Sequence, residues 1–245
     1  MIPQQTEKLT DHFAVFTGGN EQWGDTPCPS CEACHLAGAE NLRRIINACL
    51  EFGIQYLIIY AFSAKNWKRS QDGVRGIMLI FSNLPEKEPD NLHAQDVCFN
   101  HICHLERINP HLKEKMVQSA ALTKNNSRLM LNVAPDDGGR DKIVFAEQQI
   151  LREGVSPEHV IEQTLNERIF TRGLSASDFI ICTSDEQRKS DFLLWRSADS
   201  EWYFTHVLWP DFDRGVLREA LHEYERRRRR FDSRSSAEKN ESYAG

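Results

Sequence analysis

Four short runs of mainly apolar residues constrain the fold of this chain more than any other feature. They occupy residues 13–16, 56–60, 129–133 and 178–182. A strand that is apolar along its whole length is typical of a parallel sheet whose two faces are both covered. The segments between these runs show helical spacing of apolar residues, as in 39–52, which ends before Gly53. This alternation predicts the α/β class, with a central, mostly parallel sheet surrounded by helices.

Other segments complete the expected organisation. A short strand is expected at 202–206, and further helices at 143–151 before Gly154, from Ser156-Pro157 onward, and at 216–224, running into Arg226–Arg230. A helix that begins within 74–81 should be interrupted by Pro85 and Pro89. The polar composition from Asp232 onward predicts disorder. We therefore divide the chain into an N-terminal arm (1–11), one domain (12–231) and a flexible polar tail (232–245).

The composition is that of an ordinary water-soluble protein. Of the 245 residues, 40% are hydrophobic and 27% charged, and the net charge of −6 argues against broad binding of nucleic acid. The N-terminal residues lack the basic and apolar regions of a signal peptide, and we expect no transmembrane segment. The seven cysteines are an odd number, which argues against a disulfide framework. These features predict a cytoplasmic protein.

The turn after the first apolar run is the strongest local indication of function. Gly18-Gly19-Asn20 follows the run, and its backbone N–H groups could approach an anion closely. A metal-assisted diphosphate site would also need a hard oxygen ligand beside the turn, and the turn offers only Thr17, Gly18, Gly19 and Asn20. The sequence therefore predicts an anion cradle that lacks its usual metal ligand.

The motif Cys28-x-x-Cys31-x-x-Cys34-His35 has three interpretations. It contains C-x-x-C-H, the attachment pattern of c-type haem. Three cysteines and a histidine could also bind Zn²⁺, or a cluster with a further cysteine, although the spacing is tighter than in a typical zinc finger. The interpretation we prefer is a flexible loop that binds no metal.

Several blocks of sequence resemble, in order and spacing, the cis-prenyltransferases, of which undecaprenyl diphosphate synthase is the best-known member. These blocks are 12–23, 38–44, 60–69, 131–134 with 138–140, and 190–195 with 203–213, so the resemblance extends over about residues 12–231. It implies a mostly parallel sheet surrounded by helices, with an apolar tunnel for the prenyl chain. It also implies a dimer that binds an allylic diphosphate at the first glycine turn and isopentenyl diphosphate at a second, basic site. Mg²⁺ would assist the loss of diphosphate.

The resemblance assigns roles to particular residues. Its catalytic positions are His35, Ser63 and Asn66. Its substrate-binding positions are Gly19, Asn20, Trp23, Trp67, Arg69, Arg188 and Ser190. Glu201 matches a carboxylate that helps to hold Mg²⁺ across the dimer. Asp211 and Asp213 also match, and we interpret them as structural caps.

Other positions depart from the family pattern. Gly18 replaces the Mg²⁺-binding aspartate, and Gln22 and Cys31 replace two phosphate-binding arginines. In the second site Cys182 replaces an arginine and Ser184-Asp185 replaces a glycine pair. Asp136 and Asp137 are acidic where the family has other residues, so they could rebuild the metal site, or they could form a solvated acidic turn.

These features together predict an atypical enzyme that transfers prenyl groups. It would bind a short allylic diphosphate, with the help of Mg²⁺, and pass the prenyl group to an unknown acceptor in specialised terpenoid metabolism. Pro85 and Pro89 would favour a pocket too shallow for a long polyprenol, unless they lie in an exposed segment. The alternatives are a terpene synthase or cyclase, a catalytically inactive subunit that supports a partner, and a protein that binds a prenyl diphosphate without chemistry.

Overall fold

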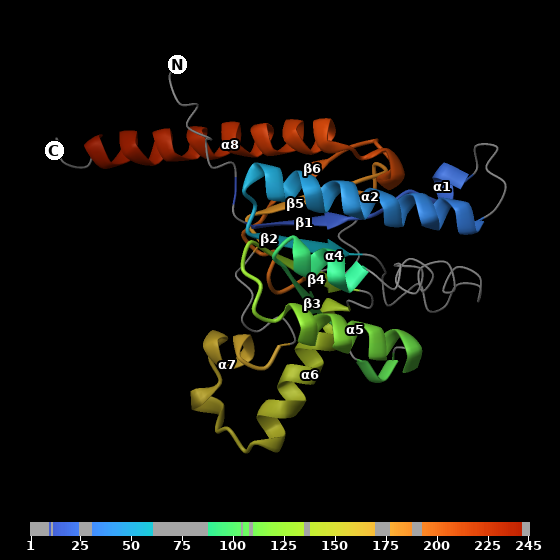
Figure 1. Cartoon of the computed structure of the whole chain (residues 1–245). Helices are drawn as coiled ribbons and strands as arrows, with labels where there is room; N and C mark the ends of the chain where they lie inside the picture. The colour runs from blue at the N-terminus through green and yellow to red at the C-terminus, as the bar shows by residue number, and fades with distance from the viewer. Residues whose placement is uncertain are drawn as a thin grey trace.

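Six parallel strands form the centre of the molecule (Figure 1). The computed structural model describes residues 10, 12–24, 31–60, 88–103, 105–107, 110–134, 138–169, 177–187 and 193–241. The strands are β1 (His12–Phe16), β2 (Tyr56–Tyr60), β3 (Val97–His101), β4 (Leu129–Ala134), β5 (Phe179–Cys182) and β6 (Glu201–Phe204). Their order is β3-β4-β2-β1-β5-β6, and each neighbouring pair is parallel. The predicted central sheet is confirmed.

The larger hydrophobic core lies on one face of the sheet. It contains alternate strand residues such as Phe13 and Leu57, packed against α2 (Cys31–Phe52), α4 (Glu88–Ala94), α5 (Pro110–Thr123) and α8 (Arg214–Glu241). Phe13, Ile45 and Phe212 have no exposed surface, and burying each such side chain contributes roughly 1.5–3 kcal/mol. A smaller cluster, with Ala14 among its members, covers the opposite face. Both faces are therefore apolar, which explains the continuous apolar runs.

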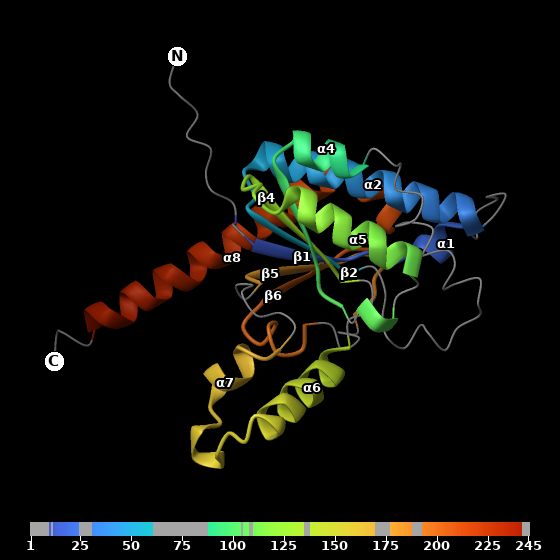
Figure 2. The same ribbon diagram turned by 60° about the horizontal axis from the view of Figure 1, so that its bottom comes forward.

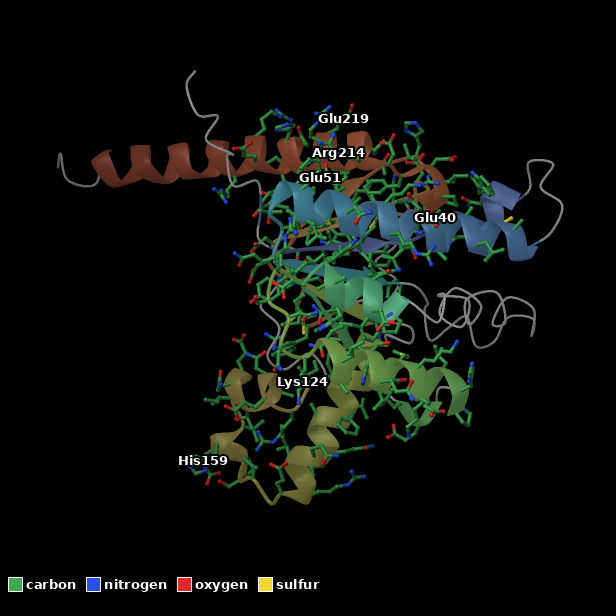
Figure 3. All side chains as sticks on the ribbon, viewed as in Figure 1. Glu40, Glu51, Lys124, His159, Arg214 and Glu219 are labelled. Carbon is green, nitrogen blue, oxygen red and sulfur yellow. The ribbon has the colours of Figure 1, made fainter. Side chains whose placement is uncertain are left out.

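Helices α2 and α8 lie side by side over the larger core (Figures 1 and 3). The Arg214 guanidinium lies 2.7 Å from a carboxylate oxygen of Glu51 between them, a surface pair worth about 0–1 kcal/mol. Gly53 follows α2 with φ +72°, and the N–H of Ile54 donates to the carbonyl of Cys49 at 3.0 Å. This is the glycine-terminated end predicted for the helix.

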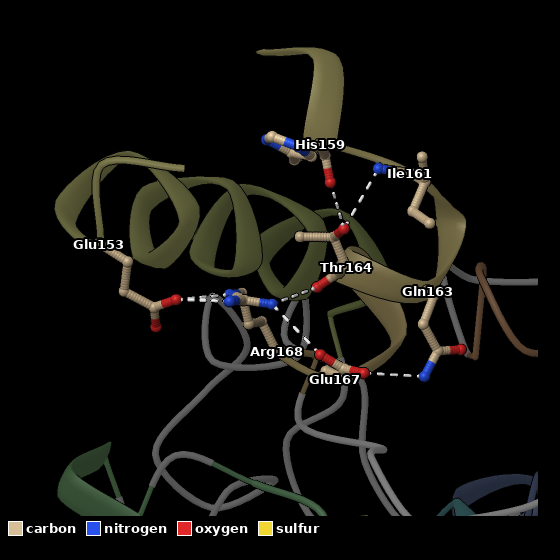
Figure 4. A network of polar contacts seen from close by, with 7 residues as sticks. All are labelled: Glu153, His159, Ile161, Gln163, Thr164, Glu167 and Arg168. Atoms are coloured by element: carbon tan, nitrogen blue, oxygen red, sulfur yellow. Dashed lines mark hydrogen bonds and ion pairs between the residues drawn. The ribbon is translucent and has the colours of Figure 1, made fainter. Parts of the chain in front are cut away.

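Two helices project from the other side of the sheet as an arm (Figure 2). They are α6 (Gly139–Arg152) and α7 (Glu162–Asn166), joined through the 3-10 helix η3 (Pro157–His159). Arg168 ties the arm together, since its Nε donates to Glu153 at 2.9 Å and its Nη1 to the carbonyl of Thr164 at 3.0 Å (Figure 4).

The helix predicted from Ser156-Pro157 is only the three-residue η3. The Ser156 hydroxyl lies 2.7 Å from Nδ1 of His159 and caps no backbone group. Thr164 starts a separate helix instead, because its hydroxyl accepts from the N–H of Ile161 and donates to the carbonyl of His159.

The disorder predicted from Asp232 is wrong up to Glu241, because α8 continues to that residue. Arginine favours helix, and charge pairs one turn apart support it. Arg226 and Arg227 both donate to the carboxylate of Glu223, and these bonds hold its pKa at about 2.

Pro89 is the second residue of α4, where a missing N–H costs nothing. It therefore lies at the start of a helix. The expected helix within 74–81 and Pro85 lie outside the described residues. Among the helices that the structure describes, none is long and apolar enough to cross a membrane.

Candidate active site

The order of the sheet reverses between β1 and β5. From β1 the sheet extends to one side through β2, β4 and β3, and to the other through β5 and β6. Ligands of open parallel sheets bind outside the carboxyl ends of the strands at such a reversal. Phe16 lies opposite Cys182 at these ends, so the turns after β1 and β5 meet there.

The turn after β1 has its carbonyl groups bound and its N–H groups available. The carbonyl of Gly18 accepts from the N–H of Trp209 and from the Thr183 hydroxyl, both at 2.9 Å. The carbonyl of Gly19 accepts from the N–H of Trp23 at 2.8 Å. Within the described part of the chain, the N–H groups of Gly18, Gly19 and Asn20 donate no hydrogen bond. Three successive free donors in one turn suit an anion.

Two glycines in this turn are required by their surroundings. Gly19 has φ +96°, and a Cβ there would lie 2.8 Å from Cδ2 of Leu208. A Cβ at Gly18 would lie 2.5 Å from Oγ of Ser184. Any side chain at either position would therefore displace a neighbour.

The short 3-10 helix η4 (Trp209–Asp211) holds the turn after β1 in place. Trp209 is buried, and its indole N–H donates to the carbonyl of Gly38 in α2 at 2.9 Å. The fully buried Asn41 donates to the carbonyls of Trp209 and Phe212 at 2.6 and 2.9 Å. Helix α2 thus positions η4, and η4 in turn binds the carbonyl of Gly18.

The first helix α1 (Asn20–Gly24) is attached to the same support. The Trp23 indole N–H lies 3.1 Å from both carboxylate oxygens of Asp211. Asp213 accepts from the N–H of Val216 at 2.9 Å and so caps α8. The capping role predicted for Asp213 is confirmed, whereas Asp211 binds the side chain of Trp23 and caps no helix in the described structure.

The turn after β5 is neutral to acidic where it leaves the sheet. Cys182 is fully buried, and burial together with the charge of Glu186 raises the pKa of its thiol to about 12. Ser184 and Asp185 both have left-handed backbones, with φ +65° and +55°, which costs roughly 1–2 kcal/mol each. Their N–H groups are already bound, to the carbonyls of Val207 and Thr205. At these positions the turn offers an anion neither a positive charge nor a free N–H group.

Residues 17–232 match the family model of a putative undecaprenyl diphosphate synthase. The chain belongs to this family of prenyltransferases. An isoprenyl transferase of Chromobacterium violaceum is 38% identical over 220 residues, which are 90% of this chain and 87% of that protein. A ditrans,polycis-undecaprenyl-diphosphate synthase ((2E,6E)-farnesyl-diphosphate specific) of Xanthomonas axonopodis pv. citri is 35% identical over 235 residues, 94% and 91% of the two chains.

A solved structure adds a different relative of this enzyme. Lavandulyl diphosphate synthase from Lavandula x intermedia, in complex with dimethylallyl diphosphate, superposes with a TM-score of 0.84. The two are 28% identical, and the match covers 89% of this chain and 96% of that one. The shared architecture agrees with the α/β fold predicted from the sequence.

The structure brings together three of the predicted site residues. Gly19, Asn20 and Trp23 belong to one turn and the helix after it. The backbone of His35 lies in the second turn of α2, which packs against α1. Apart from Glu201, the other predicted catalytic, substrate-binding and metal-binding residues lie outside the described residues. They are Ser63, Asn66, Trp67, Arg69, Asp136, Asp137, Arg188 and Ser190.

Glu201 lies at the opposite edge of the sheet from the glycine turn. It is the first residue of β6 and is level with Phe13, three residues before the end of β1. At about 3.3 Å per residue, this alone separates it from the carboxyl edge by roughly 10 Å. Its carboxylate is 3.7 Å from Nη1 of Arg227. Within one chain it is therefore remote from the predicted anion site.

The cysteine motif does not form the expected loop over its whole length. Helix α2 begins at Cys31, so Cys31, Cys34 and His35 are helical, and Cys34 is buried. A helix places these three on adjacent turns and extends the one predicted from residue 39. Cys28 lies outside the described residues. Among the side chains that the structure describes, no group of three or more His, Cys, Asp or Glu could hold a metal ion.

The structure adds Ser184 and Leu208 to the surroundings of the glycine turn. Both contact the positions where Cβ atoms of Gly18 and Gly19 would lie. Their distance along the chain hides this proximity from motif analysis, since neither belongs to the segment 12–24.

Proposed function

We propose that the enzyme binds a short allylic diphosphate at the turn after β1 and transfers or rearranges its prenyl group in specialised terpenoid metabolism. The observation that carries this proposal is the set of free N–H groups on Gly18, Gly19 and Asn20. They lie at the carboxyl edge of the sheet, where the order of the strands reverses. Donors held rigidly by η4 and Thr183 need no reorganisation when negative charge develops on the leaving diphosphate.

Residues beyond the turn complete this proposed site. We assign Arg69 to neutralise phosphate charge by a bidentate contact, as arginine does at many phosphate sites. Ser63, Asn66 and His35 would surround the reacting carbon, and Trp67 would pack beside it. These assignments follow the family resemblance.

The turn supplies N–H donors for an anion, but a Mg²⁺ ion would need oxygen ligands from elsewhere in the protein. Mg²⁺ takes oxygen ligands, and it would supply charge stabilisation to the departing diphosphate. Gly18 has no side chain to offer, and Glu201 of the same chain lies at the other edge of the sheet. We therefore propose that any Mg²⁺ is held by Asp136 and Asp137, or by Glu201 from a second copy.

The chemistry of the turn after β5 argues against isopentenyl diphosphate as the second substrate. A neutral thiol at Cys182 cannot neutralise phosphate, and Asp185 and Glu186 would repel it. The structural similarity to a protein solved with dimethylallyl diphosphate supports a short donor. We propose a neutral acceptor or a second allylic unit rather than repeated elongation.

We further propose that the enzyme is a cytoplasmic homodimer. Several large apolar side chains of the α6–α7 arm are exposed, with Leu151 70% and Ile161 60% accessible. We propose that the second copy that covers them also offers Glu201 to the neighbouring site. Light scattering should give twice the mass of the chain, and Leu151→Glu with Ile161→Glu should give a monomer. Loss of Mg²⁺-dependent turnover in that monomer, with diphosphate binding retained, would support the shared site.

The proposed function is tested by diphosphate release from dimethylallyl, geranyl and farnesyl diphosphates. Each is assayed with and without isopentenyl diphosphate, in Mg²⁺ and in EDTA, and the products are identified by mass spectrometry. We expect turnover of the shortest donor without isopentenyl diphosphate. Release with a cyclic product would instead indicate a terpene synthase or cyclase.

Ordinary elongation is the second candidate, because the curated relatives are named isoprenyl transferase and undecaprenyl diphosphate synthase. Long products made only with isopentenyl diphosphate would establish it and refute our proposal. If the chain is silent alone but raises the activity of a catalytic homologue, the supporting-subunit alternative holds.

A further inference from the structure

The glycine turn and the turn after β5 are in steric contact through two residues. A Cβ at Gly18 would lie 2.5 Å from Oγ of Ser184 and 3.1 Å from the carbonyl oxygen of Thr183. Real Cβ atoms do not approach other atoms as closely as 2.5 Å, so either the side chain or the hydroxyl must move. Gly18, unlike Gly19, has no positive φ, so its backbone would accept another residue. The closest obstacle at position 18 is therefore the hydroxyl of Ser184, and the Thr183 carbonyl oxygen is a second, weaker one.

Ser184 lies beside Gly18 in a strained backbone conformation. Its φ of +65° lies in the left-handed region, which favours glycine. Its N–H donates to the carbonyl of Val207 at 2.9 Å, which holds the residue in that conformation. Within the described structure its hydroxyl forms no hydrogen bond, although it is only partly exposed. A serine held in a strained conformation beside three free N–H donors is placed to act on the same ligand.

We infer that Ser184 determines the metal specificity of the glycine turn. Its hydroxyl occupies the space that a carboxylate at position 18 would need, and it offers a bound diphosphate a donor in place of a metal ligand. The two positions thus act as a pair: glycine at 18 with serine at 184 gives a turn that binds diphosphate without Mg²⁺. An acid at 18 becomes compatible when 184 is glycine. The inference rests on the proposed diphosphate site and specifies that diphosphate binding there does not require Mg²⁺.

The steric half of the inference is tested by thermal unfolding, which requires no ligand. Gly18→Ala should lower the melting temperature by roughly 2–4 °C or more. Ser184→Gly, which also relieves the backbone strain, should recover most of that loss in the double variant; the contact with the Thr183 carbonyl oxygen remains. Asp185→Gly is the matched control, since it relieves a similar strain next door but removes nothing that faces Gly18. If Asp185→Gly rescues Gly18→Ala as well as Ser184→Gly does, the pairing is refuted.

The ligand half is tested by calorimetric titration of inorganic diphosphate in Mg²⁺ and in EDTA. The wild type should bind equally in both. Gly18→Asp with Ser184→Gly should bind roughly tenfold or more tightly in Mg²⁺, because a carboxylate ligand makes a charge-assisted contact. Gly18→Asp alone should show less Mg²⁺ dependence than the double variant. Equal dependence in the single and double variants would overturn the inference.

The two experiments separate the inference from the proposed function. A wild type that binds no diphosphate refutes the proposed function, and the unfolding cycle still decides whether Ser184 and Gly18 exclude each other. A wild type that binds only with Mg²⁺ leaves the proposed function intact and refutes the metal-free role of Ser184.

Discussion

The turns after β1 and β5 leave neighbouring strands at the same edge of the sheet, and they use their backbone donors in opposite ways. After β1 the carbonyls of Gly18 and Gly19 are bound, and the N–H groups remain available to an anion. After β5 the N–H groups of Ser184 and Asp185 are bound to the segment that follows β6. The parallel sheet supplies the same edge to both turns. Which of them can bind phosphate is decided by the segments that surround them.

The first way to break this contrast is to fill the glycine turn. Gly19→Ala places a Cβ in the left-handed region, 2.8 Å from Cδ2 of Leu208. We expect a loss of about 2–4 kcal/mol in the free energy of unfolding, from strain and overpacking together. We also expect diphosphate affinity, measured by calorimetry, to fall more than roughly tenfold as the donors are displaced.

Gly53→Ala is the matched control for that experiment. Gly53 has φ +72°, but nothing lies within 4 Å of its missing Cβ. The substitution should cost roughly 1 kcal/mol of stability and leave diphosphate binding unchanged. Tight binding by Gly19→Ala would show that the turn is not the anion site.

The second way is to remove the support beneath the turn. Asn41→Ala leaves the carbonyls of Trp209 and Phe212 without a buried donor, and should cost about 1–3 kcal/mol in chemical denaturation. Diphosphate binding should weaken with it, because Trp209 binds the carbonyl of Gly18. Asn47→Ala on the exposed side of α2 should change stability by less than about 0.5 kcal/mol. Equal effects of the two would argue against η4 as the support.

The third way is to reduce the negative charge of the turn after β5, which repels an anion. Asp185→Asn removes a negative charge from the residue next to Ser184. Diphosphate affinity should rise by up to roughly fivefold at low salt, about 1 kcal/mol, and the gain should shrink as salt is added. Asp199→Asn, in the segment before the amino end of β6, should have no such effect. An unchanged affinity in Asp185→Asn would show that this charge does not reach the site.

The last effect appears only at alkaline pH and comes from the thiol of Cys182, whose folded-state pKa is raised to about 12 from the usual value near 9. The unfolded chain ionises this thiol first. Its contribution is therefore complete below pH 9 and is lost as the pH rises from 9 toward 12. The stability advantage of the wild type over Cys182→Ala, from denaturation curves, should narrow in that range. A constant difference would show that the thiol is not held neutral.

Local patterns were sufficient for elements whose surroundings are simple. The runs at β1, β2, β4 and β5 were predicted because both of their faces are apolar. The end of α2 at Gly53 was predicted because glycine at a positive φ is a local requirement. Strand β3 gave no clear pattern, because Val-Cys-Phe-Asn-His mixes polar and apolar residues at an edge of the sheet.

Other predictions failed where a distant or neighbouring partner changed the outcome. Thr164 ended the helix expected after Pro157 by starting a new one. Helix α8 continued past Asp232, beyond the region where composition predicted order. Of the candidate site, the sequence identified Gly19, Asn20 and Trp23, and their common location is seen in the structure. The roles of Ser63, Asn66, Arg69 and the second-site residues stay predictions.

The sequence by itself determined the parallel sheet, the glycine turn after its first strand and the prenyltransferase family. The sheet and the turn follow from residue type and spacing over a few positions of the chain, and the family follows from the resemblance of sequence blocks over about residues 12–231. Only the tertiary structure decided that the turn has free N–H groups, since that depends on Trp209 and Thr183 binding the carbonyl of Gly18. It also decided that Ser184 fills the space beside Gly18, and that Glu201 lies at the opposite edge. These facts depend on how the sheet aligns segments that are far apart in the chain, and no local pattern encodes that alignment.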